Sequence, residues 1–218
     1  MTRSRPQAAL RIDVEGARLQ APTDEQVDLL ARRAAQPGAV LPEGDEHFVK
    51  WLEGLTPVEI ERSRVARMRS NRDLTTRPGW TLDLAVIVDG EPVGLQSVSG
   101  FDRWPARRIV GTTSWLLRSH QGRGIGTGCR AAVLELAFAH LGAESAKSWV
   151  LDDNRASAAV SVKLGYRHTS TEQLTEHGRL LTEHVYQLDA QRWLDSAVRR
   201  DIAPVVTGVG GLVTLLST

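Results

Sequence analysis

The chain has 218 residues with 27 basic and 26 acidic side chains, a net charge of +1 at pH 7, so it suits one domain and lacks the charge excess typical of nucleic-acid or anionic-membrane partners. Its one cysteine, Cys129, excludes an internal disulfide and a cysteine-rich zinc site, and the histidines show no metal-ligand spacing, so no metal is expected. The sequence contains no run of about 20 apolar residues and no signal-peptide core, which predicts a cytoplasmic protein.

The first third of the chain predicts one strand and two helices. Residues 10–20 form the strand, and two capping boxes, in which a threonine is followed three residues later by Gln or Glu, open helices over 23–35 and 56–72. Between the helices, residues 36–55 contain several prolines and glycines around a few apolar side chains. This composition predicts an irregular loop that lines a substrate mouth.

The remainder alternates strands and helices. An Asp-Gly pair between two apolar runs predicts a β-hairpin over 80–99. A strand over 109–117 leads to a helix over 124–141, whose apolar residues recur at helical spacing and which Gly142 closes. The later elements are a strand at 147–151, a helix at 154–164, and strands at 166–170 and 180–188, the last two joined by a turn at His177-Gly178. The predicted order is βααβββαβαββ.

The C-terminal end differs in composition from the rest of the chain. After a short helix near Trp193, residues 199–218 form an apolar tail interrupted by glycines. Two interpretations stay open: a flexible tail, or a segment that covers an exposed sheet edge or a dimer contact. The predicted organisation is a flexible N-terminus over 1–9, one domain over 10–198, and this tail.

The most specific local signal is a glycine-rich segment between the strand at 109–117 and the following helix. Glycines let an anion approach the backbone, and the uncovered amides of a helix's first turn bind negative charge. Arg118 and Arg123 add positive charge. The spacing fits neither the dinucleotide-binding fingerprint nor the P-loop. A pyrophosphate site is therefore predicted, with a plain strand-to-helix turn as the alternative. The segment consists of Gln121, Gly122, Arg123, Gly124, Ile125, Gly126 and Thr127.

Two segments carry a resemblance to a known family. They are SWLLRSHQGRGIGTGCRAAVLELAF, residues 114–138, and DNRASAAVSVKLGY, residues 153–166. With the element order, they make residues 10–194 resemble the GNAT superfamily of acyl-CoA-dependent N-acyltransferases. The chain is most similar to the branch that modifies ribosomal-protein N-termini, near its actinobacterial succinyl-CoA-dependent members. The resemblance implies an α/β fold with a mixed, mostly antiparallel, splayed sheet flanked by helices.

The resemblance also implies an acyl-CoA, either acetyl-CoA or succinyl-CoA, as the co-substrate. Residues 121–127 and Arg118 would hold the CoA pyrophosphate, and the exposed backbone of Leu116 and Leu117 would pair with the pantetheine arm in the splay. Strand amides that a splay leaves unpaired need partners, which the pantetheine amides supply. A backbone amide near Leu117 would also bind the oxyanion of the reaction.

The helix over 154–164 places Asn154, Ser157 and Ser161 on one face, toward the ligand. Asn154 is either a CoA contact or the helix N-cap. At the position of Ser161 many relatives carry a tyrosine that protonates the leaving thiolate, and this chain lacks it. The ribosomal-protein branch uses a serine that matches Ser157, so the resemblance implies Ser157 as the catalytic residue and a CoA contact, with an ordinary surface serine as the alternative. Tyr166 matches an aromatic residue of the core.

The group that takes a proton from the acceptor amine is absent from its expected place, because Gly111 stands where relatives often carry Glu or Asp. The substitutes are His120, Asp102, and the pair Asp152 and Asp153, each of which also has a plain structural explanation. At pH 7 the free-energy cost of obtaining the neutral form is about 1 to 1.5 kcal/mol for an amine of pKa near 8 and about 4 to 5 kcal/mol for a lysine amine. The sequence therefore favours an acceptor amine of low pKa, or a base acting through water.

Three functions stay open. The first is an N-acyltransferase that moves an acetyl, succinyl or related group from acyl-CoA to a primary amine of a small molecule, peptide or protein, with Trp104 as a substrate contact. The second is a catalytically silent CoA-binding or regulatory module, and the third is a transferase whose donor is a carrier protein. The family's tendency to dimerise makes a homodimer an expectation.

Overall fold

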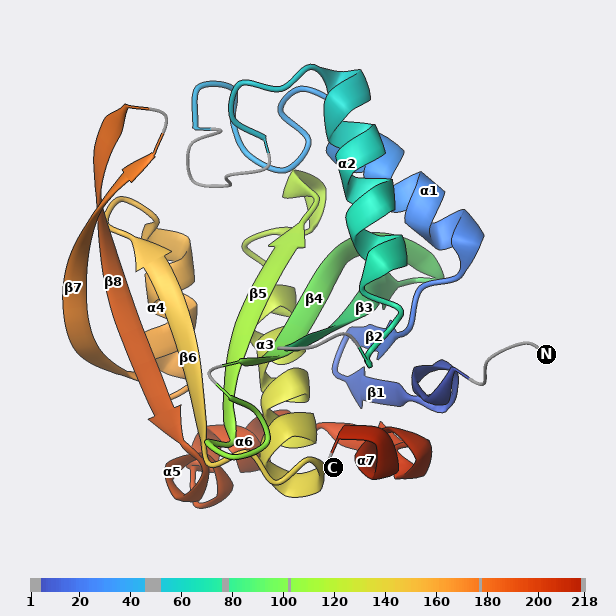
Figure 1. Cartoon of the computed structure of the whole chain (residues 1–218), viewed down its shortest axis with the longest axis vertical. Coiled ribbons are helices and arrows are strands. Elements are labelled where there is room, and N and C mark those ends of the chain that lie inside the picture. The colour runs from blue at the N-terminus through green and yellow to red at the C-terminus, as the bar shows by residue number, and fades with distance from the viewer. Residues whose placement is uncertain (1–4, 46–51, 76–78, 102, 177, 217–218) are drawn as a thin grey trace.

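The computed structural model describes residues 5–45, 52–75, 79–101, 103–176 and 178–216. Its centre is a nine-stranded sheet in the order β7-β8-β6-β5-β4-β3-β2-β1-β9 (Figure 1). Neighbouring strands pair antiparallel, except β5 and β6, which pair parallel. The expected α/β fold with a mixed, mostly antiparallel sheet flanked by helices is confirmed.

Each predicted strand and helix has a counterpart. The strands are β1 Arg11–Val14, β2 Ala17–Gln20, β3 Trp80–Val88, β4 Glu91–Phe101, β5 Ile109–Leu116, β6 Ser145–Leu151, β7 Arg167–Glu176, β8 Arg179–Asp189 and β9 Val205–Thr207. The α-helices are α1 Asp24–Ala34, α2 Pro57–Ser70, α3 Ile125–Glu135, α4 Arg155–Lys163, α5 Ala190–Leu194, α6 Ala197–Ile202 and α7 Gly210–Leu216. Shorter helical segments are the 3-10 turns η1 Pro6–Ala9 and η3 Arg118–His120, and η4 Leu136–His140, a π-helical extension of α3.

Helices α1 and α2 cover one side of the sheet, which we call the α1/α2 face. Both begin with the predicted capping box, in which the threonine side chain accepts the N3 backbone N–H and the N3 side chain accepts the threonine N–H. Their buried residues pack on Ala85 of β3, Leu95 of β4 and Trp115 of β5. This layer fixes the central strands from one side and ends at β5.

Helix α3 lies behind β5 and β4 on the opposite side, which we call the α3 face (Figure 1). Its residues from Ala131 to Leu134 are fully buried in the main core with Leu84 and Val98. Gly142 ends the helical segment with φ +70°, as its position in the sequence predicted. The glycine-rich turn at the start of α3 is thereby attached to a helix that is buried in the main core.

The N-terminal region differs from its prediction in two ways. Residues 10–20 form a hairpin of β1 and β2 around a turn with Gly16 at φ +73°, instead of one strand. Residues 6–9 form η1 rather than a flexible terminus, because Gln7 is buried and its Nε2 donates to the Arg72 carbonyl oxygen at 2.8 Å. The first error is a missed local turn at Gly16, whereas η1 depends on a contact with Arg72, 65 residues away, that no local sequence pattern contains.

The C-terminal tail is folded onto the opposite edge of the sheet from β7. Strand β9 pairs antiparallel with β1, and Leu212 and Leu216 of α7 are buried in the main core. Gly208 packs so tightly that an added Cβ would lie 2.0 Å from the Ala9 carbonyl oxygen. Of the two interpretations of the tail, the structure has the one in which it covers a sheet edge.

Candidate active site

The two halves of the sheet part between β5 and β6. The strands pair only where Ile109, Val110 and Gly111 meet residues 145–147. Beyond Gly111, β5 keeps pairing with β4 and β6 keeps pairing with β8, but no described strand pairs with residues 112–116 on the β6 side. The strands diverge toward the top of Figure 1, which gives the splay that the resemblance implied.

Backbone amides of β5 face this splay. The Leu117 N–H donates to the Val93 carbonyl oxygen at 2.9 Å. Because N–H groups alternate between the two edges of a strand, the amides of Thr112, Ser114 and Leu116 point toward the splay. The Leu116 amide is therefore oriented to pair with a pantetheine arm in the splay, as expected, whereas the Leu117 amide is already bonded to β4. An oxyanion-binding amide is available at Ser114 or Leu116 instead.

The glycine-rich turn lies at the end of β5, where it leads into α3. Gly122 and Gly124 have φ values of +71° and +82°, and an added Cβ at either would meet no atom within 4 Å. Gly124 is the N-cap of α3, and no side chain caps the helix. The amides that bond back to the Gly124 carbonyl oxygen are those of Thr127 and Gly128. The amides of Ile125 and Gly126 therefore have no partner among the described residues, and exposed Arg123 adds positive charge. This geometry suits an anion.

Two side chains of the predicted pyrophosphate site connect the turn to the loop after α1. Gln121 Nε2 donates to the carbonyl oxygens of Val40 at 2.7 Å and Leu116 at 2.8 Å. Arg118 Nη1 donates to the Gly38 carbonyl oxygen at 3.2 Å. Their side chains hold the turn in place, and a direct contact of Gln121 or Arg118 with the pyrophosphate stays a prediction.

Helix α4 begins beside the end of β6. Asn154 is its N-cap, with Oδ1 accepting the Ser157 backbone N–H at 3.1 Å, so the capping role is present in this structure. The half-buried Ser157 hydroxyl has no described hydrogen-bond partner and is free to bind a ligand. Ser161 is fully buried; its hydroxyl donates to the Ser157 carbonyl oxygen and accepts from Arg130 Nη1 at 2.9 Å. Arg130 and Ser161 thereby fix the turn of α4 that presents Ser157.

Several other residues that the sequence singled out are buried or make contacts within the protein. Burial raises the pKa of the Cys129 thiol to about 12, which makes it unreactive, and burial likewise raises the pKa of Tyr166 in the core. Asp152 pairs with His184 Nε2 at 2.7 Å. His120 Nδ1 lies 2.9 Å from the neighbouring Ser119 hydroxyl. Asp102 and the turn residue His177 lie outside the described residues.

Trp104 lies in the core, away from the splay. It is 5 % exposed, packs edge-to-face on Trp80 with ring centroids 5.5 Å apart, and donates from Nε1 to the Leu216 carbonyl oxygen at 2.7 Å. These contacts join Trp104 to the C-terminal tail and leave its predicted substrate contact without geometric support. The sequence alone gave no means of separating it from the exposed Trp149 on β6, which lies beside the splay.

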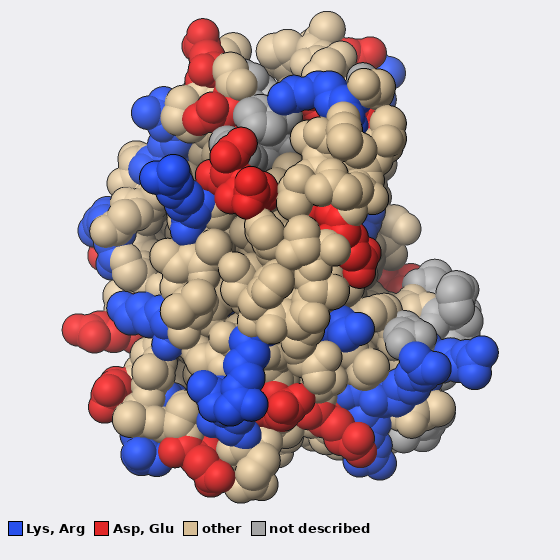
Figure 2. All heavy atoms as spheres, turned by 90° about the vertical axis from the view of Figure 1, so that its left-hand side faces the viewer, with Lys and Arg blue, Asp and Glu red and all other residues tan. Residues whose placement is uncertain are grey.

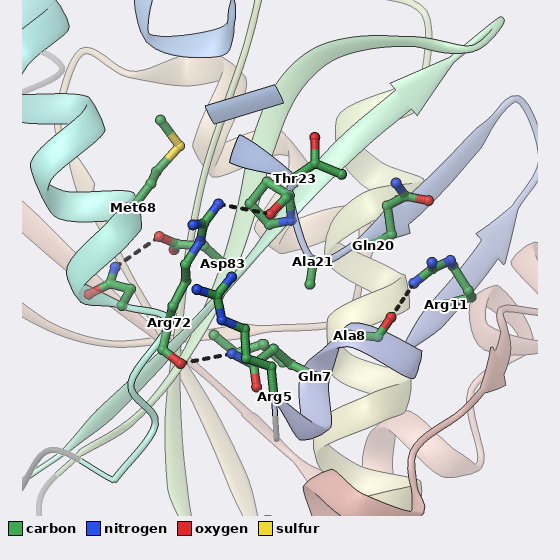
Figure 3. Close-up of a pocket in the computed structure, with 13 residues that line it drawn as sticks. Arg5, Gln7, Ala8, Arg11, Gln20, Ala21, Thr23, Met68, Arg72 and Asp83 are labelled. Carbon is green, nitrogen blue, oxygen red and sulfur yellow. Dashed lines mark hydrogen bonds between the residues drawn. The ribbon is translucent and has the colours of Figure 1, made fainter. Parts of the chain in front are cut away.

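A buried acid that sequence reasoning missed lies on the α1/α2 face. Asp83 of β3 accepts from Ser97 Oγ at 2.6 Å and from Asn71 Nδ2 at 2.9 Å, and burial raises the pKa of its carboxyl group. The signal was a single carboxylate within the otherwise apolar strand. Asp83 also lines a cavity of about 210 Å³ between η1, the connection from β2 to α1 and the end of α2 (Figure 3). This cavity is remote from β5 and β6 and contains none of the predicted site residues.

Charge is mixed on the side of the molecule formed by β7 and β8. Figure 2 shows basic and acidic side chains interspersed there, in keeping with the net charge of +1. The described part of the chain has no helix of the length and apolarity that a bilayer crossing requires. Within the same residues, His, Cys, Asp and Glu side chains do not gather in a group of three suited to a metal.

Comparison with known proteins identifies the fold and the family. The family model described as "Acetyltransferase (GNAT) domain" matches residues 18–167. The chain belongs to the GNAT acetyltransferase family. It is therefore an acyl-CoA-dependent N-acyltransferase by family, and the matched range contains the splay, the glycine-rich turn and α4.

Solved GNAT structures share the fold at low sequence identity. Mycobacterium smegmatis RimJ, solved in complex with CoA-disulfide, is 19 % identical with a TM-score of 0.69, covering 91 % of this chain and 95 % of its own. RimL, a ribosomal α-N-protein acetyltransferase solved with coenzyme A, is 17 % identical with a TM-score of 0.66, covering 83 % and 99 %. A GCN5-related N-acetyltransferase from Brucella melitensis is 16 % identical with a TM-score of 0.68, covering 88 % and 83 %.

Proposed function

We propose that this GNAT enzyme transfers an acetyl group, or a related short acyl group such as succinyl, from acyl-CoA to the primary amine of a peptide, a protein N-terminus or a small molecule. One observation carries the proposal: the amides of β5 that face the splay lie next to the uncapped amides of the glycine-rich turn. A ligand with both amide groups and a pyrophosphate matches this row of donors, and CoA has that composition, with the amides in its pantetheine arm and the pyrophosphate next to that arm.

The chemistry is an attack by the neutral amine on the thioester carbonyl. The new C–N bond forms, the C–S bond breaks, the amine loses one proton, and the CoA thiolate gains one to leave as the thiol. The amide of Ser114 or Leu116 supplies a hydrogen bond to the oxyanion, and the free hydroxyl of Ser157 supplies one to the departing sulfur. Ser157 is the catalytic residue of this proposal.

The acceptor amine is expected to have a low pKa. Gly111, where β5 and β6 part, has no side chain that could accept a proton. The buried carboxylate of Asp83 accepts hydrogen bonds from Ser97 and Asn71. An α-amine is neutral at pH 7 far more often than a lysine amine. The structurally similar RimL is an α-N-protein acetyltransferase, which agrees with an α-amine acceptor. We therefore favour an N-terminal α-amine over a lysine side chain.

The test combines donor binding with transfer. Thermal stabilisation of the protein by CoA, acetyl-CoA, succinyl-CoA and a longer acyl-CoA identifies the donor, because a ligand of the folded state raises stability in proportion to its affinity. Release of CoA is then followed with two peptides of one sequence, one with a free α-amine and a blocked lysine, the other reversed. Faster turnover of the free α-amine supports the proposal. Binding of CoA without transfer to either peptide supports the silent module, and the absence of any stabilisation supports a carrier-protein donor.

A further inference from the structure

An aromatic pair, an exposed tryptophan and a half-buried phenylalanine, lies at the point where β5 and β6 part. Trp149 of β6 is 39 % exposed, which is unusual for so large an apolar side chain. Its ring contacts Phe101 of β4 edge-to-face, with centroids 5.3 Å apart and an interplanar angle of 63°. Gly111 lies on β5, between β4 and β6. We call the rings of Trp149 and Phe101 the aromatic wall.

The register places the aromatic wall on the α1/α2 face of the splay. Gly111 pairs with Lys147, and Phe101 pairs with Ile109. Because side chains alternate along a strand, Trp149 shares the face of Lys147 and Gly111, and Phe101 shares that of Ile109 and Gly111. Helices α3 and α4 lie on the other face, whereas α1 and α2 reach no further than Trp115 of β5. Among the described helices, none covers the wall, which borders the splay on its α1/α2 side.

Gly111 lets the two rings lie close to the backbone of β5. A Cβ at Gly111 would come within 3.2 Å of Trp149 Cζ3 and 3.5 Å of Phe101 Cε1, which is closer than ordinary packing for the first contact. A Cβ at Gly111 would require the indole of Trp149 to shift by a few tenths of an ångström. The glycine that replaces a carboxylate at this position therefore also lets the Trp149 ring lie close to the backbone of β5.

We propose that the aromatic wall of Trp149 and Phe101 binds an apolar or aromatic group next to the acceptor's primary amine, and so determines acceptor specificity. This inference rests on the proposed function, in which the amine reaches the splay from its α1/α2 side. Covering an exposed aromatic ring with an apolar group lowers the free energy of the complex. Lys147, which has no described ion-pair partner, lies on the same face and disfavours a cationic group there. The acceptor class is an amine with a neutral, apolar neighbour.

The experiment measures peptide binding without turnover. Short peptides that differ only in the first residue, phenylalanine, leucine, serine or lysine, are titrated into the full chain saturated with CoA, by calorimetry. The wild-type protein is expected to bind the phenylalanine and leucine peptides most tightly and the lysine peptide least. Trp149→Ala is expected to weaken the two apolar peptides by about tenfold and the serine peptide by less than about twofold.

Three further variants separate recognition from folding. Trp149→Phe is expected to restore most of the preference, and Gly111→Ala to reduce it by displacing the indole. Val205→Ala, a change at the 56 %-exposed valine on β9, is the control and is expected to leave all four affinities unchanged. A wild-type protein without preference, or an equal loss for all peptides in Trp149→Ala, overturns the inference. Preferential binding without acyl transfer in a parallel assay supports the aromatic wall and counts against the proposed function alone.

Discussion

The chain contains two glycine-rich segments, residues 121–127 and 207–211, which the fold uses in opposite ways. In the first, added Cβ atoms at Gly122 and Gly124 would meet no atom within 4 Å. In the second, a Cβ at Gly208 would lie 2.0 Å from the Ala9 carbonyl oxygen. The first segment leaves backbone amides uncovered, and the second brings β9 against β1. In the first segment the glycines leave room for a ligand beside the backbone, whereas in the second Gly208 lets two stretches of backbone pack closely.

Changing Gly208 to alanine should have the largest effect on stability. The residue combines φ +70° with backbone contact, so the tail must shift away from Ala9. We expect the free energy of unfolding to fall by about 3 kcal/mol. Urea unfolding followed by tryptophan fluorescence measures this loss, while the affinity for CoA at 25 °C should remain that of the wild type. A Gly208→Ala variant that loses CoA affinity but keeps its stability would contradict the packing role assigned to this segment.

Changing Gly124 to alanine should act on the ligand instead. The methyl group meets no protein atom, but it covers the amides at the start of α3 and must adopt φ +82°. We expect the affinity for acetyl-CoA to fall by about a hundredfold, or about 2.7 kcal/mol, because each tenfold is worth about 1.4 kcal/mol. Calorimetric titration measures the affinity.

Gly90→Ala is the matched control for the strain. Gly90 also has φ +82° and empty space around it, but it lies in the hairpin turn between β3 and β4. This variant should lose as much stability as Gly124→Ala and none of the acetyl-CoA affinity. Equal affinities in the two variants would show that the turn at residues 121–127 does not contact CoA.

The sequence predicted more of the fold than of the site. Capping boxes and an Asp-Gly turn are local signals, so the two helices over 24–34 and 57–70 and the hairpin of β3 and β4 were predicted close to their observed bounds. The covering of the sheet edge by β9 depends on pairing with residues about 190 positions away, which no local pattern records. Trp149 became a candidate only when the register placed it beside the splay, next to Gly111.

Ser157→Ala should have a moderate effect on turnover. The hydroxyl is the free polar group on the turn of α4 that Arg130 and Ser161 hold in place. We expect kcat to fall by about tenfold, with the dissociation constant of CoA changed by less than about threefold, as for the loss of one proton donor. Single-turnover acyl transfer separates the two quantities. An unchanged kcat would remove Ser157 from the mechanism.

The smallest expected effect is on the pH dependence of stability, and it concerns Glu135 of α3. Burial alone would raise the pKa of Glu135, but hydrogen bonds from Arg199 and Trp193 outweigh it and lower this pKa below the ordinary 4.5. The lowered pKa contributes stability above pH 4.5 that is lost as pH falls through the folded-state pKa. Glu135→Gln should therefore lose about 1 kcal/mol at pH 7 and show a weaker further loss between pH 5 and pH 3 than the wild type. Parallel acid dependences in thermal unfolding would contradict this role.

Hydrogen exchange of individual backbone amides, with and without acetyl-CoA, tests the central claim most directly. The account predicts that saturating acetyl-CoA slows exchange at Thr112, Ser114 and Leu116 on the open edge of β5 and at Ile125 and Gly126 in the turn, and leaves the amides of β9 unchanged. Protection of β9 without protection of these five amides would contradict the assignment of the splay and the glycine-rich turn to the acyl-CoA site.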